Sequence, residues 1–229
     1  MDLSMRLTAI ASLVTEGNRV ADIGTDHGYI PIYLIKNHKI QSALAMDIGK
    51  GPLKRAEDHV KAHCLEEVIQ CRLSDGFSAY NAGEADTAVI AGMGGELMVR
   101  ILTAGLSKLP DELILQPQSE WFKVRQFLGE HGYKIVCEDM VKEDGKYYEI
   151  IKAQKGEPVE ESTVQQYYGP LLLGQKHPVL KDYLEYSMDS CNKIGQRLEQ
   201  AGTEAAKSRM QELQIEIQRL KEAFAYYEG

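Results

Sequence analysis

The feature that most constrains this chain is a short apolar run, residues 20–23, that leads directly into glycines at positions 24 and 28. An apolar run of this length is typical of a buried strand, and glycine lets the following backbone turn tightly and approach a ligand. An amphipathic segment starts near Tyr29 and predicts a helix whose first amides face that ligand. The order strand, glycine loop, helix predicts a nucleotide-type site.

The glycine spacing argues against a dinucleotide. It runs Asp22-x-Gly24-x-x-x-Gly28, whereas the dinucleotide fingerprint has glycines at its first, third and sixth positions. Asp26 lies at the start of the predicted helix, where a carboxylate competes with a phosphate but suits a cation. S-adenosylmethionine carries a sulfonium and an ammonium and no phosphate. We therefore predict this cofactor, bound in part by Asp22, Gly24 and Gly28.

Two further acids follow the next two predicted strands. Asp47 ends the second strand about 20 residues beyond the loop, the spacing at which a carboxylate meets an adenosine ribose. The third strand, residues 69–73, is followed by Asp75 and Gly76, where Asp75 can accept the adenine amino group, with Phe77 beside the ring. Ordinary turn chemistry explains any one of these acids. The ordered set favours a cofactor site.

A second glycine-rich loop, Gly92-Met93-Gly94, follows a predicted strand at residues 87–91 and is assigned to the same cofactor site. Another strand, residues 112–115, ends in Gln116-Pro117-Gln118. A helix over residues 119–130 is expected next, with Ser119 as its N-cap and Gly132 as its stop.

These segments predict the fold. Residues 133–137 and 147–153 resemble an antiparallel pair that closes the sheet. Five strand–helix alternations before it predict an α/β, Rossmann-like, doubly wound parallel sheet. Ligands of such sheets bind beyond the carboxyl ends of the strands, where all the loops above would lie.

The last third of the chain has a different pattern. Apolar residues recur at helical spacing in two stripes, residues 180–198 and 210–227, separated by Ala201-Gly202-Thr203, a helix stop followed by an N-cap. We predict a coiled-coil-like helical hairpin; a leucine-zipper dimer is the competing interpretation. The expected domains are residues 1–156, which bind the cofactor and carry catalysis, and residues 157–229, which are helical.

Composition narrows the class of protein. The 229 residues contain no apolar run near the roughly 18 residues of a membrane span, and no secretory signal pattern opens the chain. The four cysteines have no metal-ligand spacing, so free thiols and a cytoplasmic location are expected. His59 and His63 lie one helical turn apart without a third ligand, which favours a solvated helix face and no metal. A monomer is the simplest expectation.

Several motifs together resemble one family. The Asp22–Gly28 segment, Ser74-Asp75-Gly76, Gly92-Met93-Gly94-Gly95, Leu115-Gln116-Pro117-Gln118 and the opening Ser4-Met5-Arg6-Leu7 are similar to those of the bacterial TrmK family. The resemblance covers nearly the whole chain. It implies a class I S-adenosylmethionine-dependent methyltransferase that methylates N1 of adenine 22 in the D-arm of tRNA.

That chemistry assigns roles to particular residues. N1 of adenine has its own lone pair, so the protein must orient it and stabilise the positive ring that methylation creates. We predict Asp26 as the stabilising carboxylate, His27 as orienter or proton acceptor, and Tyr29 as a stacking platform for the flipped base. Gln116 and Gln118 are expected to read the base edge. Helix capping by Asp26, a backbone bond from His27 and core packing of Tyr29 are the structural alternatives.

The net charge of −8 has the wrong sign for an RNA-binding protein. The conflict is eased if basic side chains gather near the strand-end loops. Arg6 is expected to contact tRNA together with some of the following residues: Lys50, Lys54, Arg55, Arg100, Lys123, Arg125, Lys142 and Lys146.

Two other functions fit the cofactor loops. One is a methyltransferase that acts on a small molecule or a protein, and the other is a cofactor-binding scaffold without catalysis. The short loops between elements leave no obvious lid for a small-molecule pocket.

Overall fold

A computed structural model describes residues 2–201 and 203–228 of the chain. It contains two compact units, Met1–Glu160 and Glu161–Gly229. The sequence patterns place this division four residues earlier, after residue 156. Each unit is described by itself.

The first unit is built on one seven-stranded sheet with the order β3-β2-β1-β4-β5-β7-β6. Five strands are parallel and the last two are antiparallel, as the α/β prediction requires. The strands are β1 (Val20–Ile23), β2 (Ala43–Asp47), β3 (Ile69–Leu73), β4 (Thr87–Met93), β5 (Glu112–Pro117), β6 (Tyr133–Glu143) and β7 (Lys146–Lys155). The strand order reverses between β1 and β4, which is where ligands of such sheets bind.

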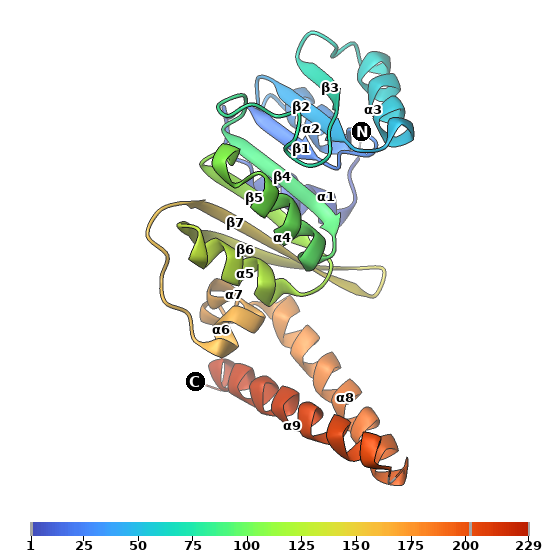
Figure 1. Ribbon diagram of the computed structural model, residues 1–229, viewed down its shortest axis with the longest axis vertical. Coiled ribbons are helices and arrows are strands. Elements are labelled where there is room, and N and C mark those ends of the chain that lie inside the picture. Colours follow the sequence, from blue (N-terminus) through green and yellow to red (C-terminus); the bar gives the residue numbers. More distant parts are fainter. Residues whose placement is uncertain (1, 202, 229) are drawn as a thin grey trace. The chain divides into compact units, whose positions relative to one another are not determined.

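Helices cover both faces of the sheet (Figure 1). Their bounds are α1 (Met5–Leu13), α2 (Tyr29–Lys36), α3 (Lys50–Ala62), α4 (Gly95–Ala104), η1 (Leu106–Lys108) and α5 (Trp121–Glu130). Apolar side chains of α4 and α5 pack on one face, and those of α1, α2 and α3 form a second cluster. The central strand β1 is buried along its whole length, so its apolar run serves both clusters.

Two details differ from the sequence prediction. No helix joins β3 to β4, because residues 74–86 form successive turns, so the expected five strand–helix alternations are wrong at this crossover. Ser119 is not the N-cap of α5; Glu120 holds that position at φ +54° without a side-chain cap bond. The Ser119 carbonyl instead accepts a hydrogen bond from the Gly95 amide at 3.0 Å. A Cβ at Gly95 would lie 2.5 Å from that oxygen, so glycine permits the contact.

The second unit is helical. Its elements are α6 (Thr163–Tyr168), α7 (Pro170–Gly174), α8 (Pro178–Ala201), α9 (Glu204–Phe224) and η2 (Ala225–Tyr227). The long helices α8 and α9 pack on one another, with Leu184, Cys191, Leu213 and Leu220 buried. This packing buries residues of both apolar stripes against each other within one chain, as the hairpin interpretation predicts. The zipper dimer would need a second chain to bury them.

The sequence predicts the connection between α8 and α9 at Ala201-Gly202-Thr203. Thr203 caps α9 by accepting a hydrogen bond from the Ala206 amide, whereas Gly202 lies outside the described residues. Across the described ranges, no helix has both the length and the apolar composition that crossing a membrane demands.

Candidate functional site

A cavity of about 640 Å³ opens where β1, β2, β3 and β4 end. Of the residues predicted to bind the cofactor, its wall includes Gly24, Asp47, Asp75, Gly76 and Met93. Their convergence follows from the topology, because the carboxyl ends of parallel strands share one edge of the sheet. Gly28, Gly92 and Gly94 lie in the same loops but outside this wall.

The loop after β1 is held in a conformation that needs glycine. Gly24 and Gly28 have φ values of +79° and +70°, and the amides of Gly24 and Thr25 donate to the Met46 carbonyl at 2.8 and 2.9 Å. A Cβ at Gly24 would lie 2.3 Å from the Met93 methyl group. The bare backbone of Gly24 therefore makes room for Met93 beside the cavity.

Asp47 has the chemistry that an adenosine ribose requires. Its carboxylate accepts hydrogen bonds from the amides of Gly49 at 2.7 Å and Asp26 at 3.3 Å, which fix its orientation. The residue is only 9% exposed and lies on the cavity wall. Each oxygen takes one amide and retains acceptor capacity for a hydroxyl. These acceptor oxygens fit the ribose hydroxyls of S-adenosylmethionine.

Asp22, predicted to bind the cofactor, does not line the cavity and instead bonds to the loop after β1. It is buried, and its carboxylate accepts a hydrogen bond from the Thr25 hydroxyl at 2.6 Å. Burial raises the pKa of Asp22 to about 7. The side chain therefore shapes the loop from beneath and does not line the cavity.

The part of the cavity wall after β3 carries both residues predicted for the adenine. Asp75 is exposed there, whereas Phe77 lines the wall but is only 3% exposed and packs edge-on against Tyr80. More accessible apolar side chains on the wall include Ile48, 67% exposed, and Leu97. The sequence gives one indication that Ile48 is exposed. It directly follows Asp47, the acid that ends β2, so it lies beyond the strand in which an apolar side chain would be buried.

Asp26 is exposed, at φ +48°, and its amide donates to Asp47 on the cavity wall. Its carboxylate is 2.5 Å from the guanidinium of Arg55 on α3 and 3.5 Å from Nε2 of His27. It caps no helix by a side-chain bond, because Gly28 is the N-cap of α2 and no such bond is made there.

Three aromatic rings gather next to this carboxylate. His27 and Tyr29 stack with centroids 4.9 Å apart and planes within 5°, and the ring of His59 lies 5.5 Å from both. Nδ1 of His59 also lies 2.9 Å from the His27 carbonyl oxygen. His59 is thus part of the loop's support, and its predicted place on a solvated helix face is wrong. Tyr29 is 37% exposed and is not a core residue.

Gln116 is fully buried, so its side chain is not accessible to a base edge. Its Oε1 accepts from Arg6 at 2.8 Å and from the Gly92 amide at 3.1 Å, while its Nε2 donates to the Pro117 carbonyl. The expectation that Gln116 reads the adenine is therefore wrong: the side chain ties Arg6 to the second glycine-rich loop. Gln118 is exposed and remains a candidate for base recognition.

The predicted RNA-facing cations differ in what they contact. Arg125 is fully buried and bonded to Glu138 and Glu149, so its inclusion is wrong. Three others pair with carboxylates: Lys54 with Asp58, Arg55 with Asp26, and Lys123 with Glu120. Lys142 lies over the ring of Tyr147. Within this predicted set, all of it in the described part of the chain, four have no carboxylate partner within 4 Å: Arg6, Lys50, Arg100 and Lys146.

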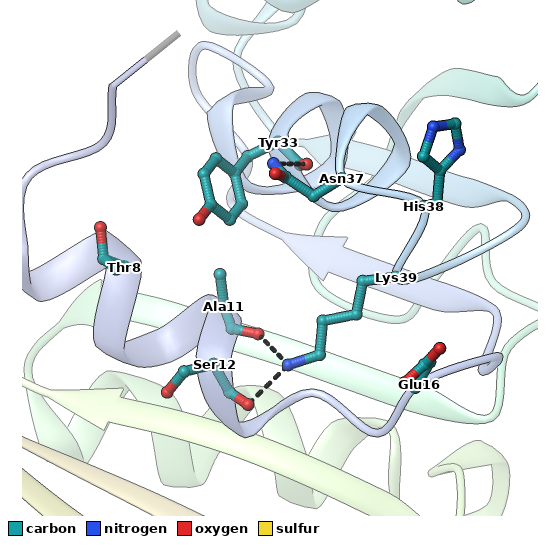
Figure 2. A pocket seen from close by; sticks show the side chains of 8 residues that line it. All are labelled: Thr8, Ala11, Ser12, Glu16, Tyr33, Asn37, His38 and Lys39. Carbon is teal, nitrogen blue, oxygen red and sulfur yellow. Dashed lines mark hydrogen bonds between the residues drawn. The ribbon is translucent and has the colours of Figure 1, made fainter.

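A second cavity, of about 300 Å³, lies between α1 and the carboxyl end of α2. Figure 2 shows Lys39 reaching from one side to the carbonyls of Ala11 and Ser12, at 2.9 and 2.6 Å. None of the predicted site residues lines this cavity. Within the described ranges, no cluster of three or more His, Cys, Asp or Glu side chains can hold a metal ion.

Comparison with known proteins gives one consistent result. A family model described as tRNA (adenine(22)-N(1))-methyltransferase, TrmK, matches residues 20–222. The Bacillus subtilis (strain 168) tRNA (adenine(22)-N(1))-methyltransferase is 35% identical over 230 residues, covering 97% of each chain.

Solved structures agree with that match. Streptococcus pneumoniae Sp1610, in complex with S-adenosyl-L-methionine, is 36% identical with a TM-score of 0.84, covering 97% of this chain and 99% of that one. M. capricolum TrmK, in complex with S-adenosyl-homocysteine, is 28% identical with a TM-score of 0.87, covering 98% of each.

Proposed function

Because this chain belongs to the TrmK family of tRNA (adenine(22)-N(1))-methyltransferases, we propose that it transfers a methyl group from S-adenosylmethionine to N1 of adenine 22 in tRNA. We assign cofactor binding and catalysis to the sheet unit and RNA contact to both units. Since its substrate is tRNA, we place its action in the cytoplasm. The observation that carries the proposal is the Asp47-bearing cavity at the carboxyl ends of β1 to β4.

Each cavity residue has a role in holding the cofactor. Asp47 accepts the two ribose hydroxyls, because its amide-bound carboxylate retains acceptor capacity toward the cavity. Asp75 accepts the adenine amino group, and Ile48 and Leu97 cover the ring. Gly24 lets the backbone of the wall approach the cofactor, while Gly28, Gly92 and Gly94 shape the segments next to that wall.

S-adenosylmethionine supplies an electrophilic methyl group on a positively charged sulfur. The N1 lone pair of adenine forms the new bond to carbon as the carbon–sulfur bond breaks, so the positive charge moves to the adenine ring. Asp26, whose amide donates to Asp47 on the cavity wall, stabilises that charge. His27 orients the base or accepts a proton from its amino group, the half-exposed ring of Tyr29 stacks on it, and Gln118 contacts its edge.

Methyl transfer to tRNA transcripts tests this function. The protein is incubated with labelled S-adenosylmethionine and either an unmodified tRNA or the same transcript with adenine 22 replaced by guanine. We expect label in the first RNA only, located at position 22. Label in both RNAs at equal levels contradicts the assigned position.

The same assay separates the competing functions. A cofactor-binding scaffold would bind S-adenosylmethionine and label no RNA. A methyltransferase acting on a protein or small molecule would label a component of an extract from which RNA has been removed.

A further inference from the structure

The β6–β7 hairpin extends past the end of the neighbouring strand at the edge of the sheet that carries the cavity. β7 is antiparallel to β5, and their last paired residues are Leu115 and Ile151. From that pair β5 continues for two residues to Pro117, whereas β7 continues for five to Lys146. At about 3.4 Å per residue, the hairpin tip projects about 10 Å beyond β5. Figure 1 shows this tip standing clear of the parallel strands.

The tip has a defined shape. Asp144 and Gly145, both with positive φ, join Glu143 to Lys146 in a two-residue turn. Turns of this kind match the twist of antiparallel strands and hold the register of the hairpin. Lys146 therefore projects from an ordered position.

Residues next to the hairpin tip are joined to the loops around the cavity. The Met5 amide donates to the Glu143 carboxylate at 2.6 Å, and the Arg6 guanidinium lies 5.3 Å from the centre of the Tyr148 ring. Arg6 also donates to Gln116, which accepts from the Gly92 amide. A ligand bound on the hairpin would thus be placed relative to the Gly92-Met93-Gly94 loop.

The exposed chemistry of this segment suits a nucleic acid. Lys142 lies 5.0 Å from the centre of the Tyr147 ring, so two cation–ring pairs lie on the hairpin, this one and that of Arg6 with Tyr148. Cations pair with phosphates, and aromatic faces stack on unpaired bases. The acids here are Glu143, whose carboxylate accepts the Met5 amide, and Asp144. With Arg6, Lys142 and Lys146 the local charge is +1, opposite in sign to the −8 of the whole chain.

We propose that the β6–β7 hairpin, residues 141–148, together with Arg6, is a tRNA-binding surface that holds the backbone next to the flipped adenine. This inference rests on the proposed function and names the part of the protein that binds the RNA. Lys146 pairs with a phosphate, and the Arg6–Tyr148 pair positions the strand beside the cavity.

A pair of charge reversals tests the surface. Lys146→Glu changes the tip, and Lys36→Glu makes the same charge change on an exposed lysine at the far end of α2, near the opposite edge of the sheet. Binding to an unmodified tRNA transcript is measured by fluorescence anisotropy as a function of salt. We expect Lys146→Glu to weaken binding at least about fivefold and Lys146→Ala to lower the salt slope by about 0.7 to 1, the loss of one phosphate contact.

The controls keep this inference separate from the proposed function. Both charge-reversal variants should bind S-adenosylmethionine as wild type does, and Lys36→Glu should leave tRNA affinity within about twofold. The anisotropy measurement needs no turnover. Absence of methyl transfer would therefore contradict the proposed methyltransferase activity but not the proposal that the hairpin binds tRNA. The proposal is overturned if Lys146→Glu binds tRNA like wild type, or if both reversals weaken binding equally.

Discussion

The guanidinium of Arg55 on α3 lies 2.5 Å from the carboxylate of Asp26, whose amide donates to Asp47 on the wall of the cavity. Both side chains are about half exposed, so the pair adds at most about 1 kcal/mol to stability. Its main consequence is geometric, because it holds Asp26 beside His27 in the left-handed loop after β1. The same helix contributes His59, one turn further on, to the ring cluster with His27 and Tyr29.

Replacing Asp26 should separate catalysis from cofactor binding. In Asp26→Asn we expect turnover to fall at least about tenfold while the affinity for S-adenosylmethionine stays near wild type, because the lost charge acts on the methylated adenine. Steady-state kinetics and calorimetry measure the two quantities. Asp58→Asn is the control, since Asp58 is an exposed acid on α3 that pairs with Lys54. Parallel loss of cofactor affinity would remove the reason to regard Asp26 as catalytic.

Gly24→Ala should damage both the loop and the cavity. Alanine at φ +79° is strained by about 1 kcal/mol or more, and its Cβ would displace the Met93 methyl group from its place. We expect a lower unfolding midpoint and at least about tenfold weaker cofactor binding. Gly129→Ala, inside α5 with no neighbouring atom within 4 Å of the new Cβ, is the matched control and should be neutral or stabilising. Equal behaviour of the two variants would show that the loop tolerates a side chain.

Asp22 should make stability fall as the pH rises. The pKa of this buried carboxyl is raised from 3.8 to about 7, so between those values the folded protein holds a proton that the unfolded chain has released. Stability is therefore lost from about pH 4 and the loss is complete above about pH 7, at about 1.4 kcal/mol per pKa unit.

The variant Asp22→Asn isolates this effect, because Glu149, whose pKa burial also raises, is present in both proteins. Urea unfolding at several pH values should show the variant gaining stability relative to wild type from pH 4 to pH 8. A difference that is constant across this range contradicts the assignment.

Arg125 should be essential for folding and not for RNA binding. Its guanidinium bonds to Glu138 and Glu149, and all three side chains are fully buried. Arg125→Leu would leave the buried carboxylates of Glu138 and Glu149 without the guanidinium that pairs with them. The expected loss is about 3 to 5 kcal/mol in the free energy of unfolding. Urea denaturation measures this loss. A triple variant that combines Arg125→Leu with Glu138→Gln and Glu149→Gln should recover part of it, because no buried charge remains; no recovery would contradict the electrostatic cause.

The sequence predicts the sheet and the cavity edge well, because the responsible signals are local. The strands β1 to β4 each lead into a glycine or an acid, and parallel strands necessarily bring those ends together. Asp47, Asp75, Gly24 and Met93 meet at one wall for that reason. The family resemblance, carried by the same motifs, is confirmed by the match over residues 20–222.

Contacts between distant segments could not be predicted in the same way. Arg125 has the composition of a surface helix residue, and only the meeting of α5 with β6 and β7 buries it against two glutamates. The position of Gln116 at the end of a predicted strand suggests contact with the substrate base. Its amide oxygen instead accepts hydrogen bonds from Arg6, 110 residues away, and from the Gly92 amide. The helical pattern alone assigns His59 to solvent, because its ring partners lie on another element.

Calorimetry with S-adenosylmethionine tests the cavity most directly, with wild type compared to Asp47→Ala. We expect wild type to bind and the variant to bind at least about tenfold more weakly, since it loses charge-assisted bonds to the ribose hydroxyls. Asp111→Ala, an exposed acid preceding β5 at the opposite edge of the sheet, should bind as wild type does. Equal affinity of Asp47→Ala and wild type, or no heat for wild type, would contradict the account.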